Sequence, residues 1–229
     1  MKQDINFKQN LALFDLDNTL LAGDSDYNWS LFLISEGLLD AKTHHDRNEQ
    51  FYADYKNGCL NIVEFLKFQL KPLSEHPRAF LDELHKKYMH KVIRPMMTVK
   101  SQNLVDKHKA AGDLCVVITA TNSFVTKPIA TAYGIDHLIG SDPEIVNGEY
   151  TGGVVGVPTY KEGKVIRLNQ WLADLGKKLG DFEHSYFYSD SHNDLALMKL
   201  VTNPVAVDAD AILSAYAEEQ AWPQMSLRD

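Results

Sequence analysis

The stretch LALFDLDNTL, residues 11–20, decides the fold of this chain. Its first four residues are apolar, so both faces of an extended segment would be buried, which predicts an inner strand of a parallel sheet. Asp15 and Asp17 follow at once. Two carboxylates this close repel each other and do not lose water together without a cation, so the pair predicts a hard divalent metal with oxygen ligands, and Mg²⁺ fits. The pair also offers a nucleophile and a proton carrier.

The composition restricts the class of protein. The chain has 229 residues with 45% hydrophobic and 24% charged side chains, as in a folded protein of one large or two modest domains. Its formal net charge of −8 argues against nucleic acid as a partner, because phosphate backbones attract an excess of Lys and Arg. The first ten residues lack a signal-peptide pattern, and no apolar run is long enough to cross a membrane. We therefore expect a cytoplasmic protein without a membrane partner, and its oligomeric state stays open.

Strands and helices alternate along most of the chain. Residues 27–91 show helical periodicity throughout, whereas short buried strands are predicted afterwards at 114–119, 135–139, 185–189 and 205–207. Residues 144–156 resemble a β-hairpin. This pattern predicts an α/β fold, namely a Rossmann-like parallel sheet core with helices on both faces and a helical cap inserted after the first strand. The expected boundaries are 1–22 and 93–229 for the core and 23–92 for the cap.

Polar side chains end several of the predicted strands. Thr119 ends the strand after the insertion, and Asp190 and Asp194 follow a later strand. The carboxyl ends of parallel strands meet at one edge of the sheet, where ligands bind. We therefore expect these side chains to converge on Asp15 and Asp17.

Together with DLDNT (15–19), three further motifs, VVITAT (116–121), EGKV (162–165) and SDSHND (189–194), resemble the four motifs of the haloacid dehalogenase superfamily of phosphohydrolases. The resemblance extends over nearly the whole chain. It is closest to the phosphoserine-phosphatase-like branch, subfamily IB, in which a helical cap follows the first motif. It implies a phosphatase that hydrolyses a small phosphomonoester through an aspartyl-phosphate.

The resemblance also implies the roles of the acidic residues. Asp15 would attack phosphorus, and Asp17 would protonate the leaving oxygen and then activate water. Mg²⁺ would be held by Asp15, by the main-chain carbonyl of Asp17 and by Asp190. Asp194 would either bind the metal or orient its ligands.

The phosphate-binding residues implied by the resemblance are Thr119, Ala120, Lys164 and Asn193. Lys161 is an alternative to Lys164 because both stand near the start of one predicted helix. His192 stands where the family has a small residue, and we interpret it, like the other histidines, as a surface residue.

The substrate is less well defined by the sequence. Asp24 lies where phosphoserine phosphatases carry an acidic residue for the substrate ammonium, but it could equally cap the following helix. Arg47 and Lys56, on the predicted cap, could meet a carboxylate. The hypothesis is an amine-bearing phosphomonoester, either phosphoserine or histidinol phosphate. The alternatives are a sugar phosphate, a nucleotide, or a regulator that binds a phosphate ester without turnover.

Overall fold

The fold is taken from a computed structural model that describes residues 9–229. Most of the segment on which the signal-peptide expectation depends lies outside the described residues. The strands are β1 (Leu11–Phe14), β2 (Leu114–Asn122), β3 (His137–Val146), β4 (Glu149–Val155), β5 (Ser185–Ser189), β6 (Asn203–Val207) and β7 (Gln224–Met225). The helices are α1 (Ser25–Ser35), α2 (Ala41–Lys56), α3 (Ile62–Ser74), α4 (Arg78–Tyr88), α5 (Arg94–Met96), α6 (Val99–Ala110), α7 (Ser123–Ala132), α8 (Glu162–Asp174), α9 (Leu195–Met198) and α10 (Ala211–Glu219). Short irregular helical segments occur at Leu16–Leu20, Met89–Ile93, Leu179–Asp181 and His192–Asp194.

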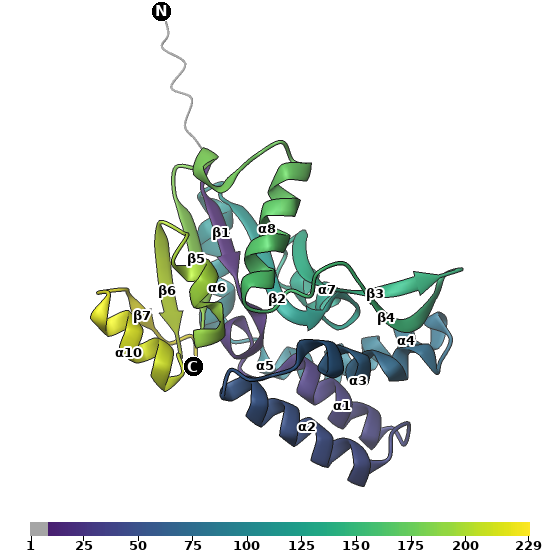
Figure 1. The fold of residues 1–229 in the computed structure, drawn as a ribbon. Helices are drawn as coiled ribbons and strands as arrows, with labels where there is room; N and C mark the ends of the chain where they lie inside the picture. The colour runs from purple at the N-terminus through teal and green to yellow at the C-terminus, as the bar shows by residue number, and fades with distance from the viewer. Residues whose placement is uncertain (1–8) are drawn as a thin grey trace, which may run out of the picture.

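One sheet organises the core, with the strand order β4-β3-β2-β1-β5-β6-β7 (Figure 1). Within residues 9–229 its neighbouring strands are parallel, except that β3 and β4 are antiparallel. Successive side chains of β1 point to opposite faces. Leu11 and Leu13 pack with α8, α9 and α10, whereas Ala12 and Phe14 pack with α6 and α7. The predicted α/β class with helices on both faces is confirmed.

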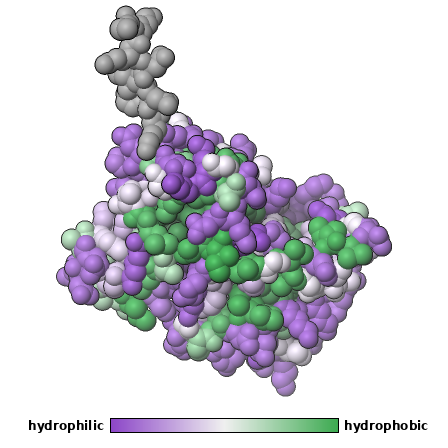
Figure 2. Space-filling view, turned by 45° about the horizontal axis from the view of Figure 1, so that its top comes forward, coloured by the Kyte–Doolittle hydropathy of each residue, from purple (hydrophilic) through white to green (hydrophobic). Residues whose placement is uncertain are grey.

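The predicted hairpin is present at the sheet edge. Asn147 and Gly148 have φ values of 53° and 87°, the left-handed conformation that a tight two-residue turn between β3 and β4 requires. The strand predicted at 135–139 is longer than expected because β3 continues into this hairpin. Ile145 and Val146 at its tip are 46% and 52% exposed, and Figure 2 shows a hydrophobic patch at the end of the molecule where the hairpin projects.

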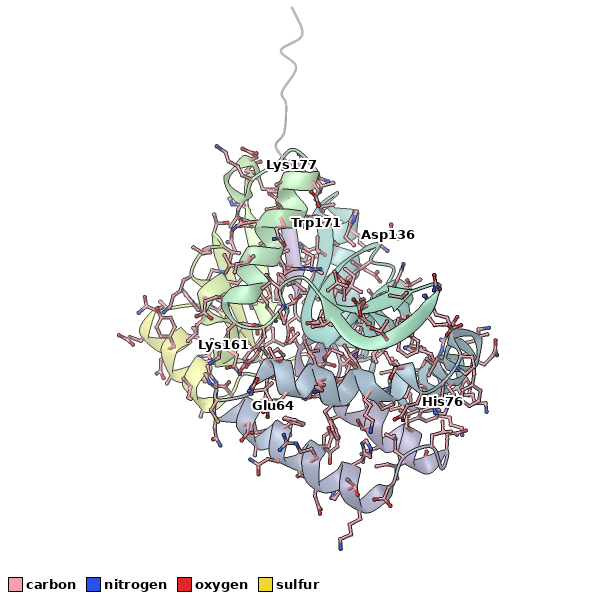
Figure 3. The ribbon with its side chains drawn as sticks, turned by 45° about the vertical axis from the view of Figure 1, so that its right-hand side comes forward. Glu64, His76, Asp136, Lys161, Trp171 and Lys177 are labelled. Carbon is pink, nitrogen blue, oxygen red and sulfur yellow. The ribbon has the colours of Figure 1, made fainter. Side chains whose placement is uncertain are left out.

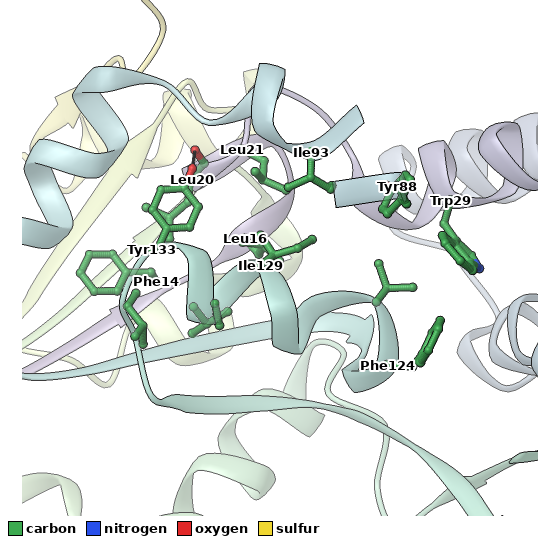
Figure 4. Close-up of a cluster of buried hydrophobic side chains, with 14 of the residues drawn as sticks. Phe14, Leu16, Leu20, Leu21, Trp29, Tyr88, Ile93, Phe124, Ile129 and Tyr133 are labelled. Carbon is green, nitrogen blue, oxygen red and sulfur yellow. Dashed lines mark hydrogen bonds between the residues drawn. The ribbon is translucent and has the colours of Figure 1, made fainter. Parts of the chain in front are cut away.

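Helices α1–α4 gather beyond the carboxyl end of β1 and form the helical cap (Figure 1). Trp29 of α1 is 1% exposed and packs edge-on against Tyr88, with ring centroids 5.1 Å apart, and against Phe124 of α7, at 5.6 Å. Figure 4 shows these rings at one end of a group of side chains that extends to Phe14 and Tyr133 in the core. The cap is therefore anchored to the core by a shared hydrophobic cluster. The boundaries between residues 22 and 23 and between 92 and 93 stay a prediction.

The expectation that the remaining histidines lie at the surface is wrong for two of them. His85 is 4% and His108 is 5% exposed. His85 Nε2 lies 2.8 Å from the carbonyl oxygen of Val125, and His108 bridges Asp113 and the Tyr188 hydroxyl. Burial is possible because each ring has polar partners, which no local sequence pattern reveals.

The first turn of α8 packs closely against the main chain of the preceding loop. A Cβ atom on Gly163 would lie 2.0 Å from the carbonyl oxygen of Pro158, which is main chain and cannot move aside cheaply. Gly163→Ala should lower the free energy of unfolding by about 1–3 kcal/mol in urea titrations. Gly180→Ala is the matched control, because a Cβ there meets no atom within 4 Å. Equal stability of the two variants would contradict the packing described here.

Candidate active site

A cavity lies between the carboxyl ends of β1 and β2 and the cap. It is lined by Asp15, Asp17, Asn18, Asp24, Asp26, Tyr27, Asn48, Phe51, Tyr52, Tyr55, Leu60, Ile62, Phe65, Gln69, Thr119, Ala120, Thr121, Tyr160, Lys164 and Asp194. Residues from all four predicted motifs and from the cap therefore meet around one space. Asp190 and Asn193, also predicted site residues, are absent from its lining.

Lys164 connects two of the motifs. Its ammonium Nζ donates to Asp15 Oδ1 at 2.8 Å and to Asp194 Oδ2 at 2.7 Å. The Ser189 hydroxyl donates to the same oxygen of Asp194 at 2.6 Å. Lys164, Asp15 and Asp194 are 2–4% exposed, so this ion-paired cluster is shielded from water. The predicted alternative, Lys161, does not line the cavity.

Thr19 joins the first motif to the fourth. Its hydroxyl donates to Asp190 Oδ1 at 2.9 Å and accepts from the Asp190 amide at 3.0 Å, and it also lies 3.4 Å from Asp15 Oδ2. Asp190 is thus close to Asp15 through a shared contact, although it does not line the cavity. Thr19 was not predicted as a site residue, even though it is part of the DLDNT motif.

Asp17 lies in a loop with an irregular backbone, because β1 ends at Phe14. Its Oδ1 accepts from the Ser25 amide at 2.6 Å, and its Oδ2 accepts from the Thr121 hydroxyl at 2.8 Å. Sequence reasoning missed Thr121. The signal was a second threonine two positions after Thr119, on the same face of the strand.

Removal from water dominates the electrostatics of the site. It raises the pKa of Asp15 to about 7, although the ammonium of Lys164 lowers it. It also raises the pKa of Asp17 to about 6, with repulsion from Asp24 as the next cause. Burial, followed by repulsion from Asp15, holds the pKa of Asp190 well above its ordinary value. Burial opposes the charge of Lys164, but attraction to Asp15 and Asp194 raises its pKa overall.

The raised pKa values of these carboxyl groups are those expected of a cation-binding site before a cation binds. Within residues 9–229, no three Asp, Glu, His or Cys side chains are grouped so as to hold a metal by themselves. The ligand set implied by the sequence motifs has two carboxylates, Asp15 and Asp190, together with the main-chain carbonyl of Asp17, and Asp194 was expected either to join it or to orient its ligands. Hard oxygen donors of this kind suit Mg²⁺. Asp194 has one oxygen engaged by both Lys164 and Ser189, which suits a residue that orients Lys164.

The phosphate-binding candidates divide into two groups. Thr119 and Ala120 line the cavity together with Lys164. Asn193 instead faces the cap, where its Nδ2 donates to the carbonyl of Tyr55 at 3.0 Å and its Oδ1 accepts from the Tyr160 hydroxyl at 3.2 Å. In this arrangement Asn193 connects core and cap and does not present its amide to the cavity.

The turn after α2 docks against the core at this point. Lys161 Nζ donates to the carbonyl of Gly58 at 2.6 Å, and Figure 3 shows Lys161 at the junction of α8 with the cap.

The prediction that His192 lies at the surface is wrong, because its side chain is 15% exposed. Its Nδ1 lies 2.8 Å from Asp210 Oδ2, and a Cβ on Gly58 would lie 2.9 Å from its Nε2.

The part of the cavity formed by the cap is acidic and aromatic. Asp24 caps α1, because its Oδ1 accepts from the amides of Asp26 and Tyr27 at 2.9 and 2.8 Å. The predicted alternative that Asp24 is a helix cap is therefore correct, and the residue also lines the cavity. Asp26 is 2% exposed; its Oδ1 accepts from Asn122 at 3.3 Å, and its Oδ2 has no hydrogen-bond partner within the described residues. Arg47 and Lys56, the cap cations that the sequence offered for a substrate carboxylate, do not line the cavity.

Comparison with known proteins gives the class. The sequence model of the haloacid dehalogenase-like hydrolase family matches residues 12–199. A protein named histidinol-phosphatase, from Neisseria meningitidis, is 47% identical over 221 residues, which cover 96% of this chain and 100% of that protein. A phosphoserine phosphatase of Mycobacterium tuberculosis is 28% identical, over 92% of this chain and 68% of its own.

Solved structures agree with this class. A Bordetella pertussis protein of unknown function matches with a TM-score of 0.92 and 46% identity, over 96% of this chain and 100% of that one. A substrate-bound phosphoserine phosphatase matches with a TM-score of 0.67 at 18% identity, over 96% and 94% of the two chains, which shows a shared fold. The chain therefore belongs to the haloacid dehalogenase-like hydrolase family. Within that family it is a phosphatase, as the resemblance predicted.

Along residues 9–229, no helix combines the length and the apolar character needed to span a bilayer.

The raised carboxyl pKa values predict how metal-free protein responds to pH. Asp15 and Asp17 ionise near 3.8 when unfolded but near 7 and 6 when folded, so the folded state binds more protons between these limits. Their contribution to stability is complete below the unfolded value and is lost as the pH rises through 6 to 7. The melting temperature without metal should therefore fall between about pH 5 and about pH 7.5. Asp15→Asn should flatten this dependence, and an identical slope in that variant would contradict the assignment.

Proposed function

We propose that the protein is a Mg²⁺-dependent phosphomonoesterase that acts on histidinol phosphate through an aspartyl-phosphate on Asp15. The observation that carries the choice of substrate is the charge of the cavity. The residues that line it include five aspartates, whereas Lys164 is the one lysine or arginine among them. Lys164 is already engaged by Asp15 and Asp194. Such a cavity favours a substrate whose organic part is cationic and carries no carboxylate.

The proposed chemistry assigns two roles to the aspartates of the first motif. Asp15 attacks phosphorus, and the ester oxygen leaves with a proton from Asp17. Asp17 then takes a proton from the water that hydrolyses the phosphorylated carboxylate. A pKa near 6 suits a group that gives and accepts a proton in one cycle.

Other residues of the site hold the phosphoryl group and the metal. Lys164, Thr119 and Ala120 would meet the phosphoryl oxygens, with Asp194 orienting Lys164. Asp15, Asp190 and the Asp17 carbonyl would hold Mg²⁺, which supplies charge neutralisation between the nucleophile and the phosphate when bound.

The cap supplies groups that match histidinol phosphate. The ammonium of histidinol phosphate would be met by Asp24 and Asp26. Asp26 has a buried oxygen that no other described residue contacts by a hydrogen bond. The aromatic side chains among the lining residues offer flat faces for the imidazole ring; they are Tyr27, Phe51, Tyr52, Tyr55, Phe65 and Tyr160. The relative named histidinol-phosphatase, at 47% identity, supports the same choice. Phosphoserine is less well matched because its carboxylate would find no free cation among the lining residues.

The substrate preference is tested by comparing kcat/KM for histidinol phosphate, phosphoserine, a sugar phosphate and a nucleotide. Histidinol phosphate should be preferred. Asp24→Asn keeps a capping side chain but removes a charge, so kcat/KM for histidinol phosphate should fall by about 10-fold or more relative to an aryl phosphate. Glu64→Gln, on an exposed part of the cap, is the matched control. A preference for the sugar phosphate or the nucleotide that persists in Asp24→Asn would overturn the proposed substrate.

The nucleophile assignment predicts that Asp15→Asn abolishes turnover while the protein stays folded, because the substitution removes one buried charge from a repulsive cluster. Activity on an aryl phosphate would be measured with Mg²⁺ and with EDTA, alongside circular dichroism. Wild-type activity in Asp15→Asn would refute the assignment. A wild-type protein that binds phosphate esters but shows no metal-dependent turnover would favour the regulator.

A further inference from the structure

The segment Leu227–Asp229 lies beside the loop that carries Asp17. Figure 1 shows the C-terminus near the point where β1 ends. Leu227 is 1% exposed and belongs to the hydrophobic cluster shared by core and cap. Its carbonyl accepts from the Thr98 hydroxyl at 2.6 Å, and its amide donates to Asp208 Oδ2 at 3.0 Å. The segment is therefore fixed to the core independently of the side chain that follows Leu227.

Arg228 spans from this segment to the catalytic loop. Its guanidinium donates from Nη1 to the carbonyl of Thr19 at 3.1 Å and from Nη2 to the carbonyl of Asn18. Nη1 also lies 3.6 Å from Asp208 Oδ2. A planar guanidinium can engage two neighbouring carbonyls at once, which a lysine ammonium matches poorly.

The carbonyls that Arg228 binds belong to a tight turn with an unusual backbone conformation. Asn18 has a φ of 56°, a left-handed conformation that non-glycine residues seldom adopt. Its amide donates to the carbonyl of Gly23 at 2.9 Å, while its own carbonyl is bound by Arg228. Asn18 is thus held on both sides. Because a trans peptide is planar, the amide direction of Asn18 fixes the opposite direction for the carbonyl of Asp17.

We infer that Arg228 is a positioning residue of the active site: its guanidinium holds the Asn18 turn in the conformation that aims the carbonyl of Asp17 and places the carboxylate of Asp17. The inference rests on the proposed function, in which that carbonyl is a ligand of Mg²⁺ and that carboxylate carries the proton. Thr19, whose carbonyl Arg228 also binds, contacts Asp190 through its hydroxyl, so the same clamp supports a second proposed ligand.

The test uses Arg228→Met and Arg228→Lys in the full chain, with an aryl phosphate and Mg²⁺. Arg228→Met should lower kcat by about 10- to 100-fold, as expected for a small misplacement of reacting groups, and should leave KM within about 2-fold. It should also reduce the rise in melting temperature that Mg²⁺ produces, because the metal would bind a less ordered carbonyl. Arg228→Lys should fall between wild type and Arg228→Met in both measurements.

Lys100→Met is the matched control. Lys100 Nζ donates to the carbonyl of Arg228, so this variant loosens the same segment but leaves the guanidinium in place. It should keep the kcat and the Mg²⁺-induced shift of wild type. If Arg228→Met does not fold, Arg228→Lys decides, because a lysine variant with wild-type kcat and an unchanged Mg²⁺ shift overturns the inference.

Two further results would count against Arg228 as a positioning residue. One is Arg228→Met with wild-type kcat and Mg²⁺ shift, and the other is Lys100→Met with losses equal to those of Arg228→Met. Failure of the proposed function gives a different result, since wild type itself would then show no Mg²⁺-dependent turnover.

Discussion

The ion pairs of Lys164 with Asp15 and Asp194 are the constraint on which the site depends. An ammonium and two carboxylates buried together are stable only while the ammonium is present, because removing Lys164 would leave two repelling carboxylates out of water without a partner for either. This requirement connects the end of β1, the start of α8 and the loop after β5, which are far apart in the chain. It also places a cation against Asp15, where the proposed function requires a phosphate to bind. The parallel sheet makes this possible by bringing its carboxyl ends to one edge.

Burial, which raises the free energy of this charged cluster, also sets the pKa values on which its chemistry depends. The cap removes the site from water, and the pKa values of Asp15 and Asp17 rise to about 7 and 6 as a result. The proposed mechanism needs one carboxylate as nucleophile and another that exchanges a proton, so the two environments must differ. They do: Asp15 faces Lys164, whereas Asp17 is bound by the Ser25 amide and the Thr121 hydroxyl. A divalent cation and the cationic part of the substrate would then supply the positive charge that balances the remaining carboxylates.

The sequence was sufficient for the fold class, because buried strands alternating with amphipathic helices leave few arrangements. It also identified polar residues that are unusual in or directly after a buried strand, namely Asp15 after β1 and Thr119 in β2, although β2 continues to Asn122 and does not end at Thr119 as predicted. It could not identify contacts made by main-chain groups or by residues distant in the chain. The amide of Asn193 turned out to face Tyr55 on the cap, and His192 to pack between Asp210 and Gly58. Arg228 stands in no motif, since its partners are two carbonyls, which any residue provides.

Covalent trapping tests the central claim, that Asp15 accepts the phosphoryl group, most directly. In Asp17→Asn the base that activates water is lost, whereas an aryl phosphate can still transfer its phosphoryl group because its leaving oxygen needs little help from a proton. Acid quenching of this variant with ³²P-labelled aryl phosphate and Mg²⁺ should therefore leave the label on the protein. Borohydride reduction of a second sample, which releases the phosphate and converts the acyl phosphate into an alcohol, should leave the reduced side chain at Asp15 in peptide mass spectrometry. A fully active wild type whose Asp17→Asn variant gives no covalent label, or gives the label at another residue, would contradict the account.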